Sequence, residues 1–239
     1  MQLTNVFDCF GVNLRSCTVL AYHRLEQVND LNNESPTNRQ PILKMSISID
    51  GFVAGPNGEL DWLFATGDDG SASWSLATIS SAGLHIMGQK TYQTSAAYWP
   101  TSTLPFAAPM NEIPKVIFSC RIEKTASAIR LTTIAANPQT YANWLHPERA
   151  GSDLVRDIEE LKGRPGGYIL AHGGASFAQS LVAADLIDEY RLAVHPVALG
   201  RGLPLFSTLA STLFLELTEV KSFKAGVVAK RYVRVRQSA

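Results

Sequence analysis

Short apolar runs, separated by glycine, proline and asparagine, follow one another along the chain from residue 42 onward. Runs this short and this apolar are typical of a parallel sheet, because its strands are covered on both faces. The predicted strands are residues 42–49, 84–87, 115–119, 129–134, 168–171 and 189–199. Two further runs, 213–220 and 227–236, predict a terminal antiparallel hairpin. In its second strand Val233 and Val235 alternate with Arg234 and Arg236, which is typical of an edge strand with one wet face.

Segments with apolar residues three or four positions apart lie between the runs and predict helices. These segments are residues 73–81, 91–97, 152–162 and 175–184, and Ser152 is the predicted cap of the third. Strands that alternate with helices predict an α/β fold in three layers, α/β/α, with a mostly parallel central sheet in one domain, residues 42–236. Residues 1–41 end in a polar, turn-rich segment and are predicted to be a poorly ordered extension.

Composition narrows the classes of function. The 239 residues carry 21 Lys+Arg and 21 Asp+Glu, so we expect no broad basic surface for nucleic acid or membranes. Cys9, Cys17 and Cys120 lack the spacing of a disulfide framework, which favours the cytoplasm. The histidines show no metal-ligand spacing, and no apolar run is long enough for a bilayer helix. A small molecule is therefore the expected ligand.

Two predicted strands end in glycine and run directly into a helix. Such junctions lie at the carboxyl edge of a parallel sheet, where backbone N–H groups of the following helix bind anions. Either junction alone is equally well explained by a glycine that ends a strand, but two in one sheet favour an anionic ligand. Neither matches a Rossmann or P-loop motif. The junctions contain Gly88, Gln89 and Thr91, and Gly173, Gly174, Ala175 and Ser176.

A third predicted strand ends at Ser119, just before Arg121. Arginine accommodates the 2′-phosphate in NADP sites, although an ordinary surface arginine is the simpler interpretation of this residue alone. Asp50 precedes a glycine- and proline-rich loop and Asp61 and Trp62 close it, so these three could line a pocket or only shape a turn. His195, within an apolar strand, is more simply a core histidine.

Together and in this order, these segments resemble the dihydrofolate-reductase-like superfamily. The closer resemblance is to the reductase domain of bacterial riboflavin biosynthesis, the RibD C-terminal domain family, and it covers residues 42–236. It rests on MSISIDGFVAGPNGELDW at 45–62, IMGQKTY at 86–92, YWP at 98–100, KVIFSCR at 115–121, GVVAKRYVR at 226–234 and, most specifically, the block 166–206.

The resemblance implies an NADPH-dependent reductase of a small polar substrate with a C=N or C=O group. In the riboflavin version, the ribose of a phosphoribosylamino-pyrimidine is reduced. Ser46 and Ala54 would lie against the nicotinamide, and Asp50, Asp61 and Trp62 would be the catalytic, substrate-side candidates on a mobile loop. The cofactor phosphates would be held by Gly88, Gln89, Thr91, Ser119, Arg121, Gly173, Gly174, Ala175 and Ser176.

The chain departs from the family pattern at two points. The first phosphate motif often carries arginine after its glycine, where this chain has Gln89, so Arg121 becomes the main candidate for the 2′-phosphate. The zinc deaminase signature that accompanies the riboflavin reductase is absent from the sequence. Two alternatives stay open, namely a dihydrofolate reductase and an NADP-binding protein without catalysis. The family resemblance also suggests a homodimer, which the apolar run 191–199 would tolerate.

Overall fold

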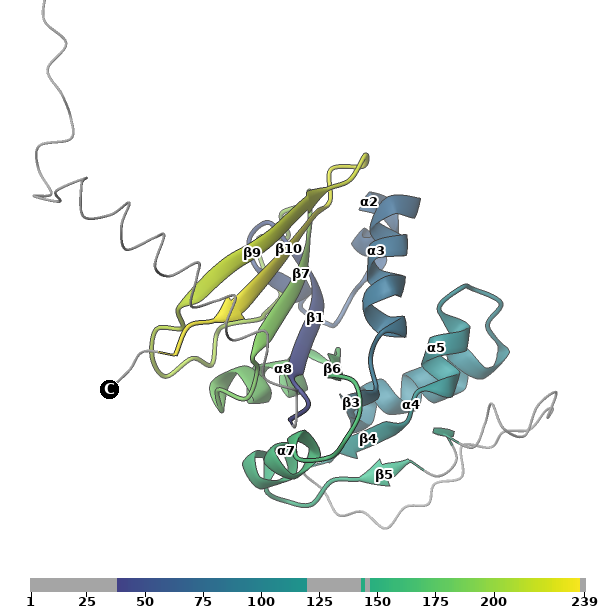
Figure 1. The fold of residues 1–239 in the computed structure, drawn as a ribbon. Coiled ribbons are helices and arrows are strands. Elements are labelled where there is room, and N and C mark those ends of the chain that lie inside the picture. Colours follow the sequence, from purple (N-terminus) through teal and green to yellow (C-terminus); the bar gives the residue numbers. More distant parts are fainter. Residues whose placement is uncertain (1–37, 120–142, 145–146, 237–239) are drawn as a thin grey trace, which may run out of the picture. The chain divides into compact units, whose positions relative to one another are not determined.

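The computed structural model describes residues 38–119, 143–144 and 147–236. Within them, one eight-stranded sheet has the order β5-β4-β3-β6-β1-β7-β10-β9 (Figure 1). Its strands are β1 (Pro41–Ser48), β3 (Leu84–Gly88), β4 (Lys115–Phe118), β5 (Glu148–Arg149), β6 (Ile169–His172), β7 (Glu189–His195), β9 (Leu215–Ser222) and β10 (Val228–Arg234). A small second sheet pairs β2 (Phe52–Ala54) with β8 (Leu203–Pro204).

The strands from β5 to β7 run parallel, while β10 is antiparallel to β7 and β9 is antiparallel to β10. The predicted mostly parallel sheet with a C-terminal hairpin is therefore confirmed. The prediction that the last strand forms the edge is wrong, because β10 is bonded on both sides and β9 is the outer strand. Arg234, the last residue of β10, instead forms an ion pair with Asp185, and Arg236, beyond the strand, forms one with Asp188.

Helices cover both faces of the sheet (Figure 1). One layer contains α3 (Asp69–Ser80), α4 (Gln89–Tyr98) and α5 (Ala107–Glu112), and the other contains α7 (Leu154–Lys162) and α8 (Ala175–Ala183). Two short elements complete the described fold, α2 (Asp61–Thr66) and the 3-10 helix η2 (Trp99–Thr101). The three layers that the sequence predicts are thus present.

The predicted elements differ from the structure mainly at their ends. Helix α3 begins at Asp69 rather than residue 73, because Asp68 forms a capping box with Ser71. The cap of α7 is Asp153 rather than Ser152, since the Asp153 carboxylate accepts from the Arg156 N–H at 3.1 Å. Strand β7 ends at His195. The predicted strand 129–134 and most of the predicted extension lie outside the described residues.

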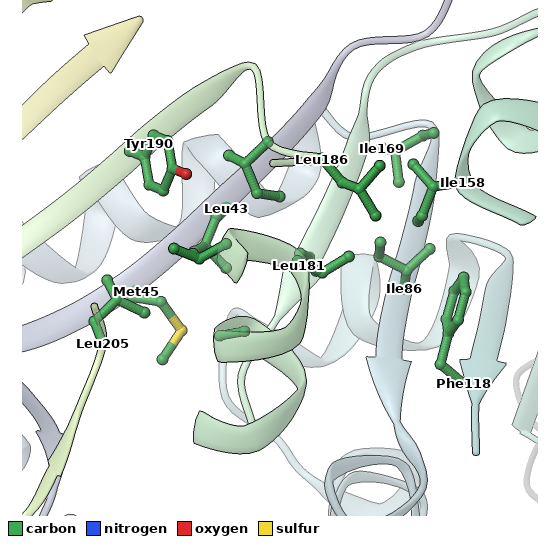
Figure 2. Packing of buried hydrophobic residues seen from close by; sticks show 14 of the residues in the cluster. Leu43, Met45, Ile86, Phe118, Ile158, Ile169, Leu181, Leu186, Tyr190 and Leu205 are labelled. Atoms are coloured by element: carbon green, nitrogen blue, oxygen red, sulfur yellow. The ribbon is translucent and has the colours of Figure 1, made fainter. Parts of the chain in front are cut away.

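Successive side chains of each strand point to opposite faces of the sheet, so the core consists of two clusters, one on each face. Leu43 and Met45 of β1 pack with residues of α7 and α8, such as Ile158 and Leu181 (Figure 2). The neighbouring Ile42 belongs to the cluster on the side of α3, α4 and α5. Because successive side chains of a strand point to opposite faces, Lys44, Ser46 and Ser48 also face the α3 side. Among the described residues, no helix is long and apolar enough to cross a membrane.

Candidate functional site

The two predicted glycine junctions meet at the carboxyl edge of the sheet. Strands β3 and β6 are parallel neighbours, so Gly88 at the end of β3 lies beside the glycines that follow β6. A Cβ atom on Gly174 would lie 2.6 Å from the Thr91 hydroxyl oxygen, and one on Gly88 would lie 3.2 Å from Cβ of Phe177. The start of α4 therefore touches the start of α8, and glycine is required where they meet.

Both helix starts leave their first N–H groups without a side-chain cap. Gly88 is the N-cap of α4 and Gly174 that of α8, whereas aspartates cap α3 and α7. A Cβ atom on Gly173 would have no heavy atom within 4 Å, so there is open space above this turn. Helix starts without a side-chain cap among the described residues, next to open space, fit the phosphates of a dinucleotide.

The predicted nicotinamide contacts lie on two different sheets. Lys44 of β1 pairs in register with His172 of β6, so Ser46 lies two residues nearer the carboxyl edge, level with the glycines after β6. Ser46 is half-buried, whereas Ala54 of β2 is buried. The Ala54 carbonyl oxygen would lie 2.3 Å from a Cβ atom on Gly202, so β2 packs tightly against the segment before β8.

Asp50 fastens the loop after β1 to the loop after β7. Its carboxylate accepts hydrogen bonds from the Ser48 hydroxyl at 2.5 Å and from the N–H groups of Gly200 and Leu199 at 2.7 and 3.2 Å. The Ser48 hydrogen bond is the main reason that the pKa of Asp50 is below its ordinary value. An ionised Asp50 with three donors is a structural anchor of this loop.

Trp62 is buried against His195 at the end of β7. The two rings meet edge to face with centroids 5.3 Å apart. Thr66 donates to the Trp62 carbonyl at 2.7 Å and lies 2.8 Å from His195 Nδ1, so its oxygen is placed to accept from an Nδ1–H. Asp61, in contrast, is exposed in the first turn of α2. Among the described residues, no hydrogen bond or ring contact joins Asp50, Asp61 and Trp62.

Lys44 of β1, level with the end of β6, is a charged residue that the sequence analysis did not single out. Its neighbours in register on the two adjacent strands are His172 and Arg191, and burial lowers the pKa of Lys44 to about 8. Burial, together with the charge of Lys44, lowers the pKa of His172 to about 3. Lys44 has no hydrogen-bond or ion-pair partner among the described residues. The one charged residue in a strand of apolar residues and serines was the signal that could have revealed it.

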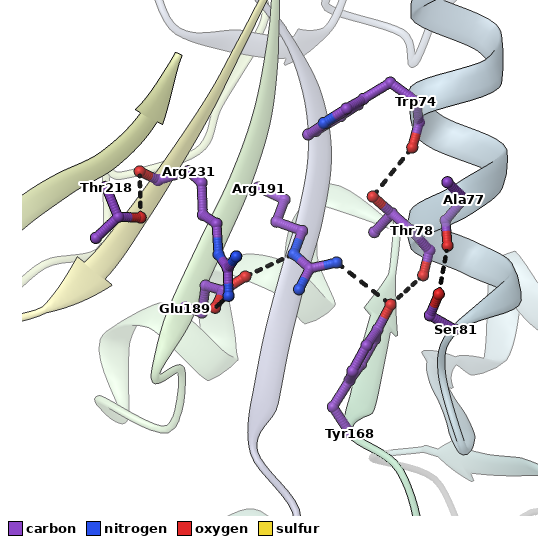
Figure 3. A network of polar contacts seen from close by, with 9 residues as sticks. All are labelled: Trp74, Ala77, Thr78, Ser81, Tyr168, Glu189, Arg191, Thr218 and Arg231. Atoms are coloured by element: carbon purple, nitrogen blue, oxygen red, sulfur yellow. Dashed lines mark hydrogen bonds and ion pairs between the residues drawn. The ribbon is translucent and has the colours of Figure 1, made fainter. Parts of the chain in front are cut away.

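A polar network fixes α3 to the sheet beside Lys44 (Figure 3). Glu189, fully buried on β7, accepts from Arg191 Nε at 2.5 Å and from Arg231 Nη2 at 2.7 Å. Arg191 also donates to the Tyr168 hydroxyl at 3.3 Å, and this hydroxyl donates to the Thr78 carbonyl of α3. The network links helix α3 to Tyr168 and to strands β7 and β10, and Arg191 of this network is the in-register neighbour of Lys44.

Helix α3 carries no carboxylate on its buried side. Its buried residues are Ser71, Ser75, Thr78 and Ile79. Asp68 is occupied by the capping box and by the Ala225 N–H, and Asp69 is exposed. By the family resemblance, a dihydrofolate reductase would place a lone carboxylate on the helix after the mobile loop. Helix α2 follows that loop and its one carboxylate, Asp61, is exposed, so neither α2 nor α3 buries a carboxylate and the folate alternative is disfavoured.

The third predicted phosphate contact is described only in part. Ser119 directly follows β4 at the same edge, whereas Arg121 lies outside the described residues and stays a prediction. A separate hollow of about 550 Å³ lies near the ends of α8 and β10, and its walls include Asp185 and Arg234. None of the predicted site residues lines it.

The three-layer fold, with two glycine junctions at the carboxyl edge of its sheet, has the architecture of the dihydrofolate-reductase-like class of proteins. The sequence profile described as the RibD C-terminal domain matches residues 40–229. The chain belongs to the RibD C-terminal domain family, so the predicted resemblance to the riboflavin-biosynthesis reductases is confirmed.

Individual comparisons agree with this assignment. The uncharacterised protein YyaP of Bacillus subtilis is 28% identical over 190 residues, which are 80% of this chain and 92% of the relative. A deaminase/5-amino-6-(5-phosphoribosylamino)uracil reductase of Thermotoga maritima is similar with a TM-score of 0.56 and 16% identity, over 83% of this chain and 57% of that one. A dihydrofolate reductase of Enterococcus faecalis complexed with NADP(H) gives a TM-score of 0.50 and 11% identity, over 82% and 96% of the two chains. At these identities the likeness to the solved structures shows the fold.

Proposed function

We propose that this chain uses NADPH to reduce a small polar substrate of the riboflavin-biosynthesis type, 5-amino-6-(5-phosphoribosylamino)uracil or a close analogue. The observation that carries the proposal is the contact between two uncapped helix starts, with Thr91 against Gly174. Family membership supports it, as do the activity in the name of the Thermotoga protein and the NADP(H) complex of the Enterococcus reductase.

The backbone of the two junctions would hold the negative charges of the cofactor. N–H groups at the starts of α4 and α8 would bind phosphate oxygens, and Ser46 and Ala54 would contact the nicotinamide end. When bound, the reduced nicotinamide supplies the hydride, while the protein supplies position and charge. The residues assigned to the cofactor are Ser46, Ala54, Gly88, Gln89, Thr91, Ser119, Arg121, Gly173, Gly174, Ala175 and Ser176.

Reduction of a C=N or C=O group also needs a proton at the heteroatom. Asp50 is a poor donor, because its hydrogen bonds lower its pKa and keep it ionised at neutral pH. Lys44 holds a proton at neutral pH, since its pKa is about 8, and its ammonium group faces the α3 side of β1. We therefore assign the role of proton donor to Lys44 Nζ. Asp50 would hold the loop after β1 in place, and Asp61 and Trp62 would contact the substrate.

Two measurements test the proposed function in sequence. NADPH fluorescence titration should show saturable binding, and absence of binding at high micromolar protein would refute the proposal. The pyrimidine substrate named above should then cause NADPH oxidation. Turnover of dihydrofolate that an antifolate blocks would favour the folate alternative. NADPH binding with no oxidation by either substrate would favour a binding protein without catalysis.

We also propose that the protein is located in the cytoplasm and forms a homodimer. Sparse, unpatterned cysteines support a reducing compartment. Strand β7 (residues 189–195) is bonded on both sides, so this part of the run 191–199 cannot pair with another copy through its backbone. The outer strand β9 exposes Leu217 and Val220 at 49% and 52%, which makes it the better candidate for contact between copies.

A further inference from the structure

The guanidinium of Arg149 lies beside Gln89, the first residue of α4. The family pattern often has arginine after the first glycine, and this chain has Gln89, the first residue of α4. Arg149 of β5 reaches across the sheet edge, and its Nη1 lies 3.4 Å from Gln89 Oε1. A guanidinium from a different strand thus stands at the N-terminus of α4.

The position of Arg149 follows from the sheet register. Arg149 pairs with Ile117 of β4, and residues paired in neighbouring strands point to the same face. Ile117 belongs to the cluster that contains Tyr92 of α4, so Arg149 faces the same side as that helix. The charge of Arg149 also reaches Tyr92, where it opposes the rise that burial causes in the pKa of this phenol.

The carboxylate next to Arg149 in the sequence is paired with another arginine, so Arg149 is available for an anion. The neighbouring Glu148 accepts two hydrogen bonds of 2.7 Å from Arg164, so its carboxylate is already neutralised. Among the described residues, Gln89 is the hydrogen-bond partner of Arg149, and no carboxylate contacts it. A planar guanidinium with free donors, beside uncapped N–H groups, fits a phosphate monoester.

We propose that Arg149 recognises the 2′-phosphate of NADPH and sets the preference of this protein for NADPH over NADH. The inference rests on the proposed function, because it needs the cofactor to bind along the starts of α4 and α8. It assigns the 2′-phosphate to Arg149 of β5 in place of Arg121, the candidate from the sequence, with Gln89 as the residue that orients the guanidinium.

Binding of two adenosine phosphates tests this role without any reaction. Adenosine 2′,5′-bisphosphate and 5′-AMP differ only in the 2′-phosphate, and calorimetry of the full chain gives both affinities. We expect Arg149→Ala to weaken the bisphosphate about tenfold or more, as for loss of one charge-assisted hydrogen-bonded pair. The affinity for 5′-AMP should change less than twofold. Arg156→Ala is the matched control, because Arg156 is exposed on α7 and its side chain has no hydrogen bond among the described residues.

A second variant tests whether affinity for the bisphosphate can be restored. Gln89→Arg in the Arg149→Ala background returns a guanidinium to the N-terminus of α4 and should recover most of the bisphosphate affinity. If Arg149→Ala loses the same affinity for both adenosine phosphates, or loses none, Arg149 does not recognise the 2′-phosphate. The proposed function would still stand in that case, provided that the unaltered chain binds NADPH. If the unaltered chain binds neither NADPH nor the bisphosphate, the proposed function fails as well.

Discussion

Gly174 shows how a single residue links stability to the proposed function. Its φ of +82° is strained for a residue with a side chain, and a Cβ atom there would lie 2.6 Å from the Thr91 hydroxyl oxygen. Both the turn before α8 and the contact with α4 therefore need glycine at this position.

Gly174→Ala should lower the free energy of unfolding by about 1–3 kcal/mol and weaken NADPH binding. Urea denaturation and fluorescence titration measure the two effects. Gly58→Ala is the control, because Gly58 has φ of +91° but open space around its Cβ position, so it should lose stability without losing cofactor affinity. Equal effects of the two variants on NADPH would mean that the contact with Thr91 has no role in binding.

Lys44 should titrate close to pH 8 in the folded protein. Carbon NMR of the methylated lysines follows this titration, and Lys44→Met identifies the signal. Because the pKa of Lys44 is lower folded than unfolded, the unfolded chain binds more protons above pH 8, and stability should rise between about pH 8 and 10.5. Lys44→Met should reduce this rise. A Lys44 signal that titrates at the ordinary lysine value would remove its assignment as a proton donor that is tuned by burial.

At the scale of elements, the sequence predicted the strands of the described core and the helices between them. Buried runs such as the one that becomes β1 have a single stable environment, which is the middle of a covered sheet. The sequence analysis missed β5, α2, α5 and the small β2–β8 sheet, because the stability of these short elements comes from contacts with distant segments. Trp62 of α2, for example, is held by His195 of β7.

Helix α3 is joined to the hairpin of β9 and β10 through Asp68. One oxygen of its carboxylate caps α3 at Ser71, and the other accepts from the Ala225 N–H at 2.7 Å. Asp68→Ala should therefore lower the midpoint of urea denaturation more than Asp153→Ala, which removes only the cap of α7.

The pH dependence of stability provides a check on Asp68. Hydrogen bonds from Ser71 and Ala225 lower the pKa of Asp68 in the folded protein. The stability that this carboxylate contributes is therefore present above its pKa in the unfolded chain, about 4, and is lost as the pH falls through its folded pKa. Asp68→Ala should lose less stability than the unaltered chain on acidification. An equal loss would show that the hairpin contact does not depend on this carboxylate.

At the scale of the whole molecule, β9 is the outer strand of the eight-stranded sheet and is the place where we expect copies to associate. A bulge opposite Arg231 and Tyr232 lets Leu217 and Val220 share one face although they are three residues apart. Both are about half exposed and lie at the edge of a sheet whose other described strands from β4 to β10 are paired on both sides.

If β9 joins two copies, replacement of Leu217 and Val220 by lysine should convert a dimer to a monomer in light scattering. NADPH affinity should then stay within about twofold, because the glycine junctions lie on other strands. Lys221→Glu on the same strand is a control for a change of charge without loss of apolar surface. A dimer that persists in the double variant would place the interface elsewhere.

The sequence alone determined the order of strands and helices, the two glycine junctions and the family. These features are encoded locally, since apolar periodicity, strand-ending glycines and motif spacing act over a few residues. Tertiary structure decided which side chains meet. Parallel neighbours brought Thr91 to Gly174, left Lys44 without a partner among the described residues, and placed Arg149 beside Gln89, sixty positions earlier in the chain. Such pairings depend on sheet order and register, which no short stretch of sequence specifies.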